Sequence, residues 1–265
     1  MAYISNLLTH WAGRGQIPEK QYEILTQDIL KQKKLRFGQP ELSVLSKYLP
    51  SDASCEMVSF ADIPFSECES HCNKYSKFGI SFNKAYLTSL YATPVWYFQN
   101  PAFVGNLYYI VGTSKKLDEI LFEKTGKHEF DFNDREKGHT IHKNTLPLLK
   151  YIFSYAEAYD KELTFPYEGS HLEQEDFFKR TNEKAGYFER EWRIIPSTLA
   201  NLKLPNIITE QNGHKYLNFE EKHVKYIIIP KKFINQFSEE REAIFSEYDK
   251  ENIPVVLTYE DLKYM

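Results

Sequence analysis

Residues 186–196 read Gly-Tyr-Phe-Glu-Arg-Glu-Trp-Arg-Ile-Ile-Pro. Side chains of a β-strand point alternately to the two faces of a sheet. If this segment is a strand, Glu189, Glu191 and Arg193 share one face, and Trp192 and Ile194 lie on the other. Two neighbouring carboxylates repel each other, and burial would raise the pKa of at least one. A fold that keeps both acids therefore pairs them with arginine or uses them chemically.

Two interpretations of this strand stay open at the sequence level. In the first, it is a half-exposed edge strand whose Glu and Arg side chains form a solvated ladder. In the second, it forms part of a functional site, because carboxylates held near each other have altered proton affinities.

The composition indicates an ordinary globular chain. It has 265 residues, of which 42% are hydrophobic, which is enough for a substantial core in a single domain. The formal charge of -4 and a pI near 6.1 do not indicate a nucleic-acid-binding protein, although a local basic cleft is compatible with them. We find neither a secretory signal nor an apolar run long enough to span a membrane, and we expect a cytoplasmic protein without membrane partners.

The local patterns predict an α+β fold: one domain over residues 1–265, with a mixed, mostly antiparallel sheet flanked by helices. A helical insertion is expected at about 106–165, because apolar residues recur there at helical spacing. We expect strands at 57–64, 78–82, 94–98, 207–209, 216–219, 223–230 and 253–257. Helices are expected from Pro18 to Lys34, after a capping box at Ser66–Glu69, at 84–90 and from Ser238.

Asn212-Gly213 predicts a tight hairpin turn. The strand expected at 223–230, the helix from Ser238 and the strand at 253–257 together predict one strand–helix–strand unit.

Two further clusters are candidates for chemistry. His10 and Arg14 flank a glycine-containing loop and could bind a sugar hydroxyl and a phosphate, or could be a capping histidine and a surface arginine. Cys55, Cys68, His71 and Cys72 are the residue types that bind zinc. Their spacing disfavours such a site, since adjacent His71 and Cys72 diverge on a helix, and we predict no metal.

Three blocks of the sequence resemble the AbiGi family of bacterial abortive phage resistance proteins. They are Thr9-His10-Trp11 with Gly13-Arg14, then Phe60-Ala61-Asp62-Ile63-Pro64 through His71 and Tyr75 to Phe78-Gly79-Ile80-Ser81-Phe82 and Pro94-Val95, and finally Glu189-Arg190-Glu191-Trp192-Arg193. The resemblance implies a role in phage defence, often beside a nucleotidyltransferase-like toxin, with the AbiGi member commonly described as the antitoxin.

The order of polar residues also resembles that of ADP-ribosyltransferases, in which an early His or Arg, a middle Ser and a late Glu surround NAD. This resemblance implies catalytic roles for Glu191, Glu189 and His10, with Glu191 holding the ribose while positive charge develops and Glu189 orienting the acceptor. It also implies NAD contacts from Arg14, Trp11, Ser59 and Tyr75. The middle block departs from the family pattern, because it lacks a clear Ser-Thr-Ser.

The sequence thus supports two functions of different classes. One is an enzyme that transfers ADP-ribose from NAD to a macromolecule or nucleotide. The other is an antitoxin or sensor that binds a toxin partner without turnover. An enzyme would need His10 or Arg14 within one ligand's width of Glu191, in a cleft lined by aromatic rings such as Tyr75 or Trp96.

Overall fold

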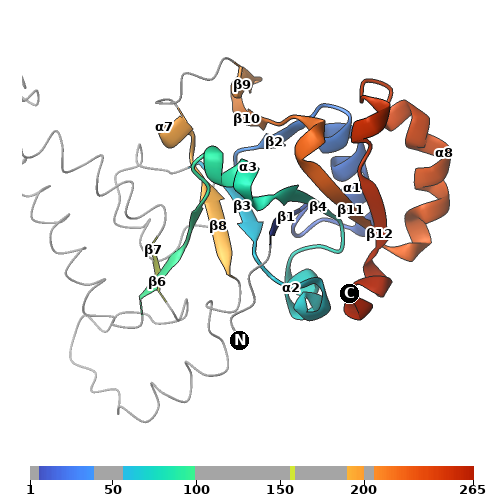
Figure 1. Ribbon diagram of the computed structural model, residues 1–265, viewed down its shortest axis with the longest axis horizontal. Coiled ribbons are helices and arrows are strands. Elements are labelled where there is room, and N and C mark those ends of the chain that lie inside the picture. Colours follow the sequence, from blue (N-terminus) through green and yellow to red (C-terminus); the bar gives the residue numbers. More distant parts are fainter. Residues whose placement is uncertain (1–5, 39–55, 99–155, 159–189, 200–205) are drawn as a thin grey trace, which may run out of the picture. The chain divides into compact units, whose positions relative to one another are not determined.

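The computed structural model describes residues 6–38, 56–98, 156–158, 190–199 and 206–265 (Figure 1). The chain divides into two compact units. The first unit comprises residues 1–38, 56–94 and 189–265, and the second comprises 39–55 and 95–188. Nearly all of the described residues, and the whole candidate site, belong to the first unit.

The strands of the first unit are β1 (Leu7–Trp11), β2 (Lys34–Arg36), β3 (Val58–Ala61), β4 (Gly79–Asn83), β5 (Thr93–Pro94), β8 (Glu191–Ile194), β9 (Ile208–Gln211), β10 (His214–Asn218), β11 (Val224–Ile229) and β12 (Val255–Thr258). Its α-helices are α1 (Pro18–Glu23), α2 (Glu69–Lys74), α3 (Lys84–Ser89), α7 (Pro196–Leu199) and α8 (Ile234–Ile244). The shorter helical turns are η1 (Ile24–Leu30), η4 (Phe65–Glu67), η6 (Glu221–His223), η7 (Lys231–Phe233), η8 (Lys250–Asn252) and η9 (Tyr259–Tyr264).

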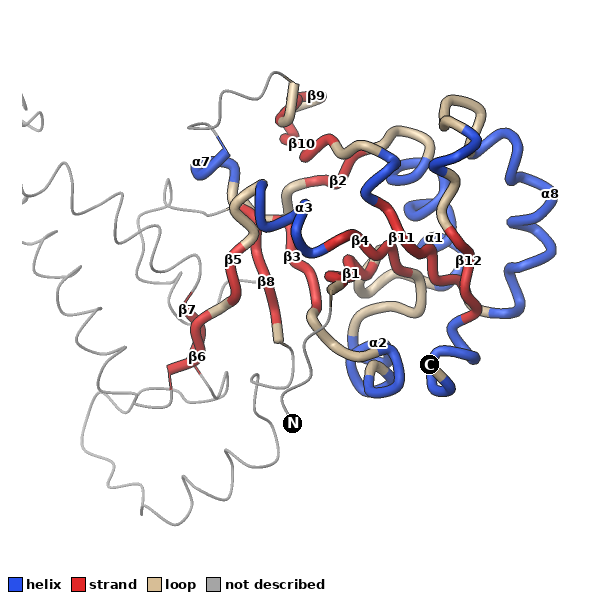
Figure 2. Tube along the Cα trace, viewed as in Figure 1, coloured by secondary structure: helices blue, strands red, loops and turns tan. Residues whose placement is uncertain are grey.

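A seven-stranded sheet forms the centre of this unit, in the order β12-β11-β4-β1-β3-β8-β5 (Figure 2). Only β11 and β12 pair in parallel within it, and the other neighbours are antiparallel. The predicted α+β class with a mixed, mostly antiparallel sheet is confirmed.

The two faces of this sheet are covered by different parts of the chain. On one face, Leu8, Phe60 and Phe82 belong to the main hydrophobic core, which also receives residues from α1, η1 and α8. On the other face, Trp11, Ala61 and Ile228 pack with residues of α2 and of the C-terminal turn. Figure 1 shows α2 and the C-terminus close together beside the sheet. Strand alternation assigns each side chain to one of these faces.

The predicted strand–helix–strand unit is confirmed as β11, α8 and β12. The long crossover is what a parallel pair requires. The helix begins at Ile234 rather than at Ser238, and Ser238 bonds to the carbonyl of Ile234 one turn earlier instead of capping the helix.

A three-stranded sheet, β2-β10-β9, packs Leu35 and Leu217 into the main core. The predicted hairpin turn is confirmed between β9 and β10. Asn212 and Gly213 have φ angles of 53° and 73°, which Asn and Gly adopt at less cost than other residues.

Other local predictions need correction. The capping box is absent from Ser66–Glu69: that region holds the short turn η4, and α2 starts at Glu69 without a side-chain cap. The helix from Pro18 becomes a π-helical turn at Ile24 and ends before Lys34.

The second unit is described over a small part of its length. The predicted strand at 94–98 is divided between β5 and β6 (Trp96–Phe98), and β6 pairs in parallel with β7 (Ala156–Ala158). Residues 156–158 fall within the helical insertion expected at about 106–165 but form this strand instead. The rest of the insertion expected at 106–165 lies outside the described residues. Among the described helices, none has the length and apolar character that a membrane crossing requires.

Candidate functional site

The centre of the candidate site is a polar cluster shared by β3 and β8. Antiparallel pairing sets Ser59 opposite Arg193 and Ala61 opposite Glu191, so Ser59, Glu191 and Arg193 face the same side of the sheet. Arg193 donates from Nε to Glu191 Oε1 and from its terminal nitrogen to Oε2, both at 2.9 Å. Ser59 Oγ donates to Glu191 Oε1 at 2.6 Å. This confirms the expected pairing of Glu191 with Arg193.

The ion pair lies largely out of solvent. Arg193 is 4% exposed, and the side chain of Glu191 is 15% exposed. Two parallel charge-assisted bonds fix the carboxylate plane, and the Ser59 hydroxyl fixes it further. The carboxylate can still accept a hydrogen bond from a bound hydroxyl.

A ladder of rings and one guanidinium extends this face toward α2. The Trp11 and His71 ring centroids are 6.2 Å apart, and the His71 and Tyr75 centroids are 4.4 Å apart in a stacked arrangement. The Arg14 guanidinium carbon lies 4.8 Å from the centre of the Tyr75 ring. His71 and Tyr75 can join because residues four apart share one side of a helix. Hereafter this set of four side chains is called the aromatic ladder.

Trp11 carries an unusual buried donor. Trp11 is 9% exposed, and its Nε1–H has no hydrogen-bond partner among the residues that the structure describes. The six-membered ring lies against Gly79, where an added Cβ would be 2.9 Å from Trp11 Cε3. The opposite, N–H-bearing edge therefore turns away from β4. An unpaired buried donor costs free energy, and ligand-binding sites are one place where such a cost is offset.

His10 lies in the strand that adjoins β3, but its side chain faces the main core. Its ring makes an edge contact with Phe60, with centroids 6.0 Å apart. Nδ1 lies 2.9 Å from the carbonyl oxygen of Ser59 and must carry the proton, since a carbonyl can only accept. Burial lowers the pKa of His10, and the bond to the carbonyl opposes this shift. The ring is thus neutral at pH 7.

The structure therefore brings together some of the predicted site residues and separates others. One face holds Glu191, Ser59, Trp11, Tyr75 and Arg14. The side chain of His10 is on the opposite face, because it is one residue from Trp11 in a strand. Of the two alternatives expected near Glu191, Arg14 therefore lies on the same face of the sheet as Glu191, and the side chain of His10 does not.

Other predicted residues fall outside the description. Glu189 lies outside the described residues, as does Cys55, and the side chain of Trp96 is not described. Cys68 and Cys72 are buried free thiols, and within the described segments no group of three or more His, Cys, Asp or Glu could hold a metal ion.

Sequence reasoning did not include His71 or Arg193 among the site residues. The signal for His71 was its four-residue spacing from Tyr75, which placed both on one side of a helix. Arg193 follows Glu191 by two positions, the spacing that puts both on one face of a strand.

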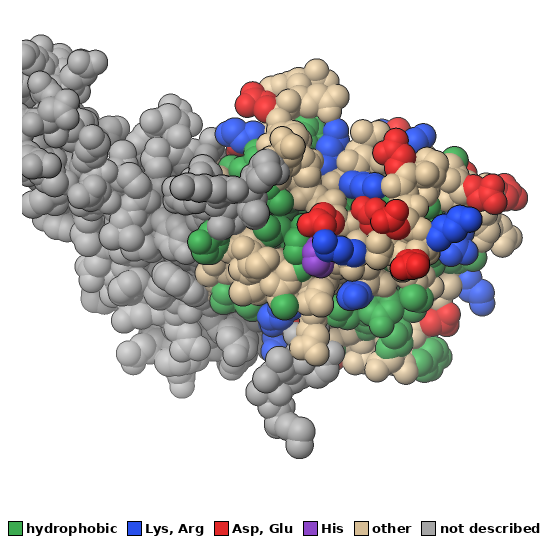
Figure 3. Space-filling view, turned by 45° about the horizontal axis from the view of Figure 1, so that its top comes forward, with side chains coloured by type: hydrophobic (Ala, Val, Ile, Leu, Met, Phe, Trp, Pro, Cys, Tyr) green, Lys and Arg blue, Asp and Glu red, His purple; other side chains and the backbone are tan. Residues whose placement is uncertain are grey.

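Acidic and basic side chains are interspersed on the face of the described residues drawn in Figure 3. This mixture agrees with the formal charge of -4 and does not form the one-sided basic field of a nucleic-acid-binding surface.

Comparison with known proteins places the chain in a family without assigning it a chemistry. No curated protein and no solved structure matches it. A family model described as "Putative abortive phage resistance protein AbiGi, antitoxin" matches residues 27–236, which is most of the chain. The matched range includes Ser59, Tyr75, Glu191 and Arg193. The chain belongs to the AbiGi family of abortive phage resistance proteins.

Proposed function

We propose that this protein acts in the cytoplasm as the antitoxin of an abortive infection pair, and that it neutralises a toxin partner by binding it. Membership of the AbiGi family supports the role in phage defence. The observation that carries the non-catalytic part of the proposal is the state of Glu191. Its carboxylate already accepts three hydrogen bonds from Arg193 and Ser59. Such a group fixes β8 to β3 and needs no substrate to satisfy it.

Co-expression with the product of the neighbouring gene, as the candidate toxin, tests this proposal. The protein should restore growth of cells that express the toxin and should copurify with the toxin. The Glu191→Gln variant keeps the shape of the side chain but leaves the buried Arg193 without its carboxylate, so its folding is first checked by urea unfolding. The folded variant should rescue growth as well as the wild type if the role is binding alone. Failure of the wild type to rescue growth or to copurify with the toxin would contradict the antitoxin proposal.

A second candidate function is transfer of ADP-ribose from NAD, with the face of the sheet that carries Ser59 and Glu191 as the active site. The specific observation in its favour is the 2.6 Å hydrogen bond from Ser59 to Glu191, with the aromatic ladder on the same face of the sheet. In this reaction the bond between ribose C1′ and nicotinamide breaks, and nicotinamide leaves as a neutral base. A bond forms from C1′ to the acceptor nucleophile, which loses a proton. Glu191 would hold a ribose hydroxyl and stabilise the developing positive charge, and the rings would stack on nicotinamide.

Purified protein incubated with labelled NAD and cell lysate distinguishes the two functions. A transferase should release nicotinamide and label an acceptor, and Glu191→Gln should reduce both by at least about a hundredfold, as removal of one electrostatic contributor typically does. A protein that only binds should give neither signal. Growth rescue that persists in Glu191→Gln while the wild type shows no nicotinamide release would eliminate the transferase function.

A further inference from the structure

A cavity of about 640 Å³ lies on a part of the first unit that the site described above does not use. Its walls come from α3, from the approach to β9, and from the segment between β10 and β11. The volume is within the range of small-molecule sites. The lining residues are Asn83, Ala85, Tyr86, Ser89, Leu90, Asn206, Ile207, Asn218, Phe219, Glu220 and His223, and all of them are described.

Two stacked rings form one wall. Tyr86 and His223 have centroids 3.8 Å apart and planes inclined by 10°. Burial raises the pKa of Tyr86 to about 12 and lowers the pKa of His223, so both rings are neutral at pH 7. A flat, uncharged ring system can extend such a stack, and stacking contacts between bases and aromatic side chains are favourable for every base.

The polar groups of the lining suit the edges of a heterocycle. Asn83, Asn206 and Asn218 line the cavity with side-chain amides. The Asn83 Oδ1 accepts from the Ala85 N–H at 2.9 Å, so Asn83 offers a ligand its donors, whereas Asn206 can offer both donors and an acceptor, the combination that reads a base edge. Asn218 holds the wall in place, since its Nδ2 donates to the Asn206 carbonyl at 2.7 Å and its Oδ1 accepts from Thr209 at 3.2 Å.

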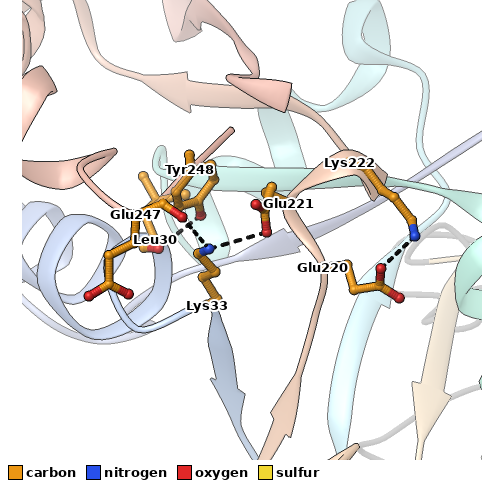
Figure 4. Close-up of polar contacts among 7 residues, drawn as sticks. All are labelled: Leu30, Lys33, Glu220, Glu221, Lys222, Glu247 and Tyr248. Atoms are coloured by element: carbon orange, nitrogen blue, oxygen red, sulfur yellow. Dashed lines mark hydrogen bonds and ion pairs between the residues drawn. The ribbon is translucent and has the colours of Figure 1, made fainter. Parts of the chain in front are cut away.

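The charge of the lining disfavours phosphate. None of the eleven lining residues is Lys or Arg, and one, Glu220, is acidic. Lys84, between the lining residues Asn83 and Ala85, forms an ion pair with Asp62 at 2.7 Å. Lys222, next to His223, lies 2.5 Å from the Glu220 carboxylate, and Figure 4 shows this pair. The pair leaves no net positive charge to hold a phosphate, whereas the free oxygen of Glu220 can accept a bond from a sugar hydroxyl.

The segment that carries Glu220 and His223 is held in place by Lys33, which is not part of the cavity lining. Figure 4 shows Lys33 between two partners: it lies 3.3 Å from the Glu221 carboxylate and donates to the Glu247 carbonyl at 2.6 Å. The Tyr248 hydroxyl donates to the Leu30 carbonyl at 2.8 Å beside it. These contacts position the wall before a ligand arrives, and a preformed wall reduces the ordering cost of binding.

We infer that this cavity binds an unphosphorylated nucleoside, with the base stacked on the pair formed by Tyr86 and His223 and its edge bonded to the asparagine amides. The inference is independent of the function proposed for the site on β3 and β8.

Isothermal titration of the full chain tests the inference, with adenosine, guanosine, cytidine, uridine and ribose as probes. At least one nucleoside should bind saturably and ribose alone should not. The 5′-monophosphate of that nucleoside should bind several-fold more weakly, because the lining lacks a cation. His223→Ala should weaken binding about tenfold or more, while His223→Phe, which keeps a flat ring, should retain most of it.

Lys225→Ala provides the matched control, because Lys225 is exposed on β11 and outside the lining. It should leave nucleoside affinity unchanged within about twofold. Urea unfolding of each variant separates loss of binding from loss of folding. The inference is overturned if none of the four nucleosides saturates the folded wild type, if the monophosphate binds more tightly than the nucleoside, or if a folded His223→Ala binds as well as the wild type.

Discussion

At the scale of single residues, the pair formed by Glu191 and Arg193 shows what sequence alternation can and cannot establish. The strand pattern places both side chains on one face and predicts their contact correctly. The same rule separates His10 from Trp11, and knowledge of which face carries Glu191 would have excluded His10 from that face. That knowledge depends on the register between β1 and β3, which pairs Thr9 with Ala61 and is set by tertiary packing rather than by local pattern.

Removing Arg193 should destabilise the protein strongly. In Arg193→Met the Glu191 carboxylate keeps its partly buried position but loses a bidentate partner, and the expected cost in the free energy of unfolding is about 3–5 kcal/mol. Urea denaturation measures this cost. The double variant Glu191→Gln/Arg193→Met should recover part of it, because no buried charge remains.

Lys20→Met is the control for Arg193→Met. It breaks an exposed pair with Glu23 on α1 and should leave the free energy of unfolding nearly unchanged. Equal losses for the buried and exposed variants would show that the ion pair on β8 has no special role in stability.

His10 should make stability depend on pH. Its pKa in the folded protein is lowered by burial from the ordinary value of 6.5, so the unfolded chain binds the proton more readily. Stability from this group is therefore fully present above pH 6.5 and is lost as the pH falls below that value. The difference in the free energy of unfolding between the wild type and His10→Gln, measured from pH 8 to pH 5.5, should change in favour of the variant at the acidic end. A difference that is constant with pH would contradict the burial argument.

At the scale of elements, the sequence predicts whether a segment is a helix, a strand or a turn better than it predicts where that element begins and ends. The turn at Asn212-Gly213 and the strands around it are correct because the backbone conformation is encoded in two adjacent residues. The helix expected from Ser238 starts a turn earlier, since packing of Phe233 and Phe237 into the core determines where it begins. The supposed capping box at Ser66 fails for a related reason, because Pro64 and the turn after it direct the chain before α2 can form.

The close approach of β4 to β1 should make Gly79 intolerant of a side chain. A Cβ at this position would lie 2.9 Å from Trp11 Cε3 and 3.2 Å from Thr9 Cγ2. Gly79→Ala should therefore destabilise the protein by about 1–3 kcal/mol, through displacement of the Trp11 ring. Denaturant unfolding and tryptophan fluorescence would measure the two effects.

Gly38→Ala is the control for Gly79→Ala, because no described residue has an atom within 4 Å of a Cβ at Gly38. It should leave stability within about 0.5 kcal/mol of the wild type. A loss as large as that of Gly79→Ala would show that flexibility of glycine, rather than contact with Trp11, decides the result.

At the scale of the whole first unit, two separate clusters stabilise one sheet. The larger cluster lies on the face of Phe60 and Phe82, and the smaller one joins Trp11 to α2 and to Leu262 near the C-terminus. The 19 Phe and 19 Tyr residues of the sequence predict an aromatic-rich core. They do not predict that a second cluster on the other face depends on residues more than 250 positions apart in the chain, Trp11 and Leu262, because that arrangement follows from the order of the strands.

Leu262→Ala tests the importance of the smaller cluster. Leu262 is 1% exposed, and its truncation should lower the free energy of unfolding by about 2–5 kcal/mol. Tyr264→Ala, at a side chain that is 77% exposed, should change it by less than about 0.5 kcal/mol. Chemical denaturation followed by circular dichroism would compare the two, and a neutral Leu262→Ala would mean that the C-terminal turn does not stabilise this face.

The central position of β4 has a consequence for biosynthesis. One edge of β4 bonds to β1, close to the start of the chain, and the other bonds to β11 at residues 224–229. A nascent polypeptide on the ribosome cannot close this sheet until residue 229 has left the exit tunnel. Folding of the first unit must therefore follow translation of nearly all the sequence that it contains. Until then, the edge of β4 that pairs with β11 has unpaired backbone N–H and C=O groups, to which a chaperone could bind.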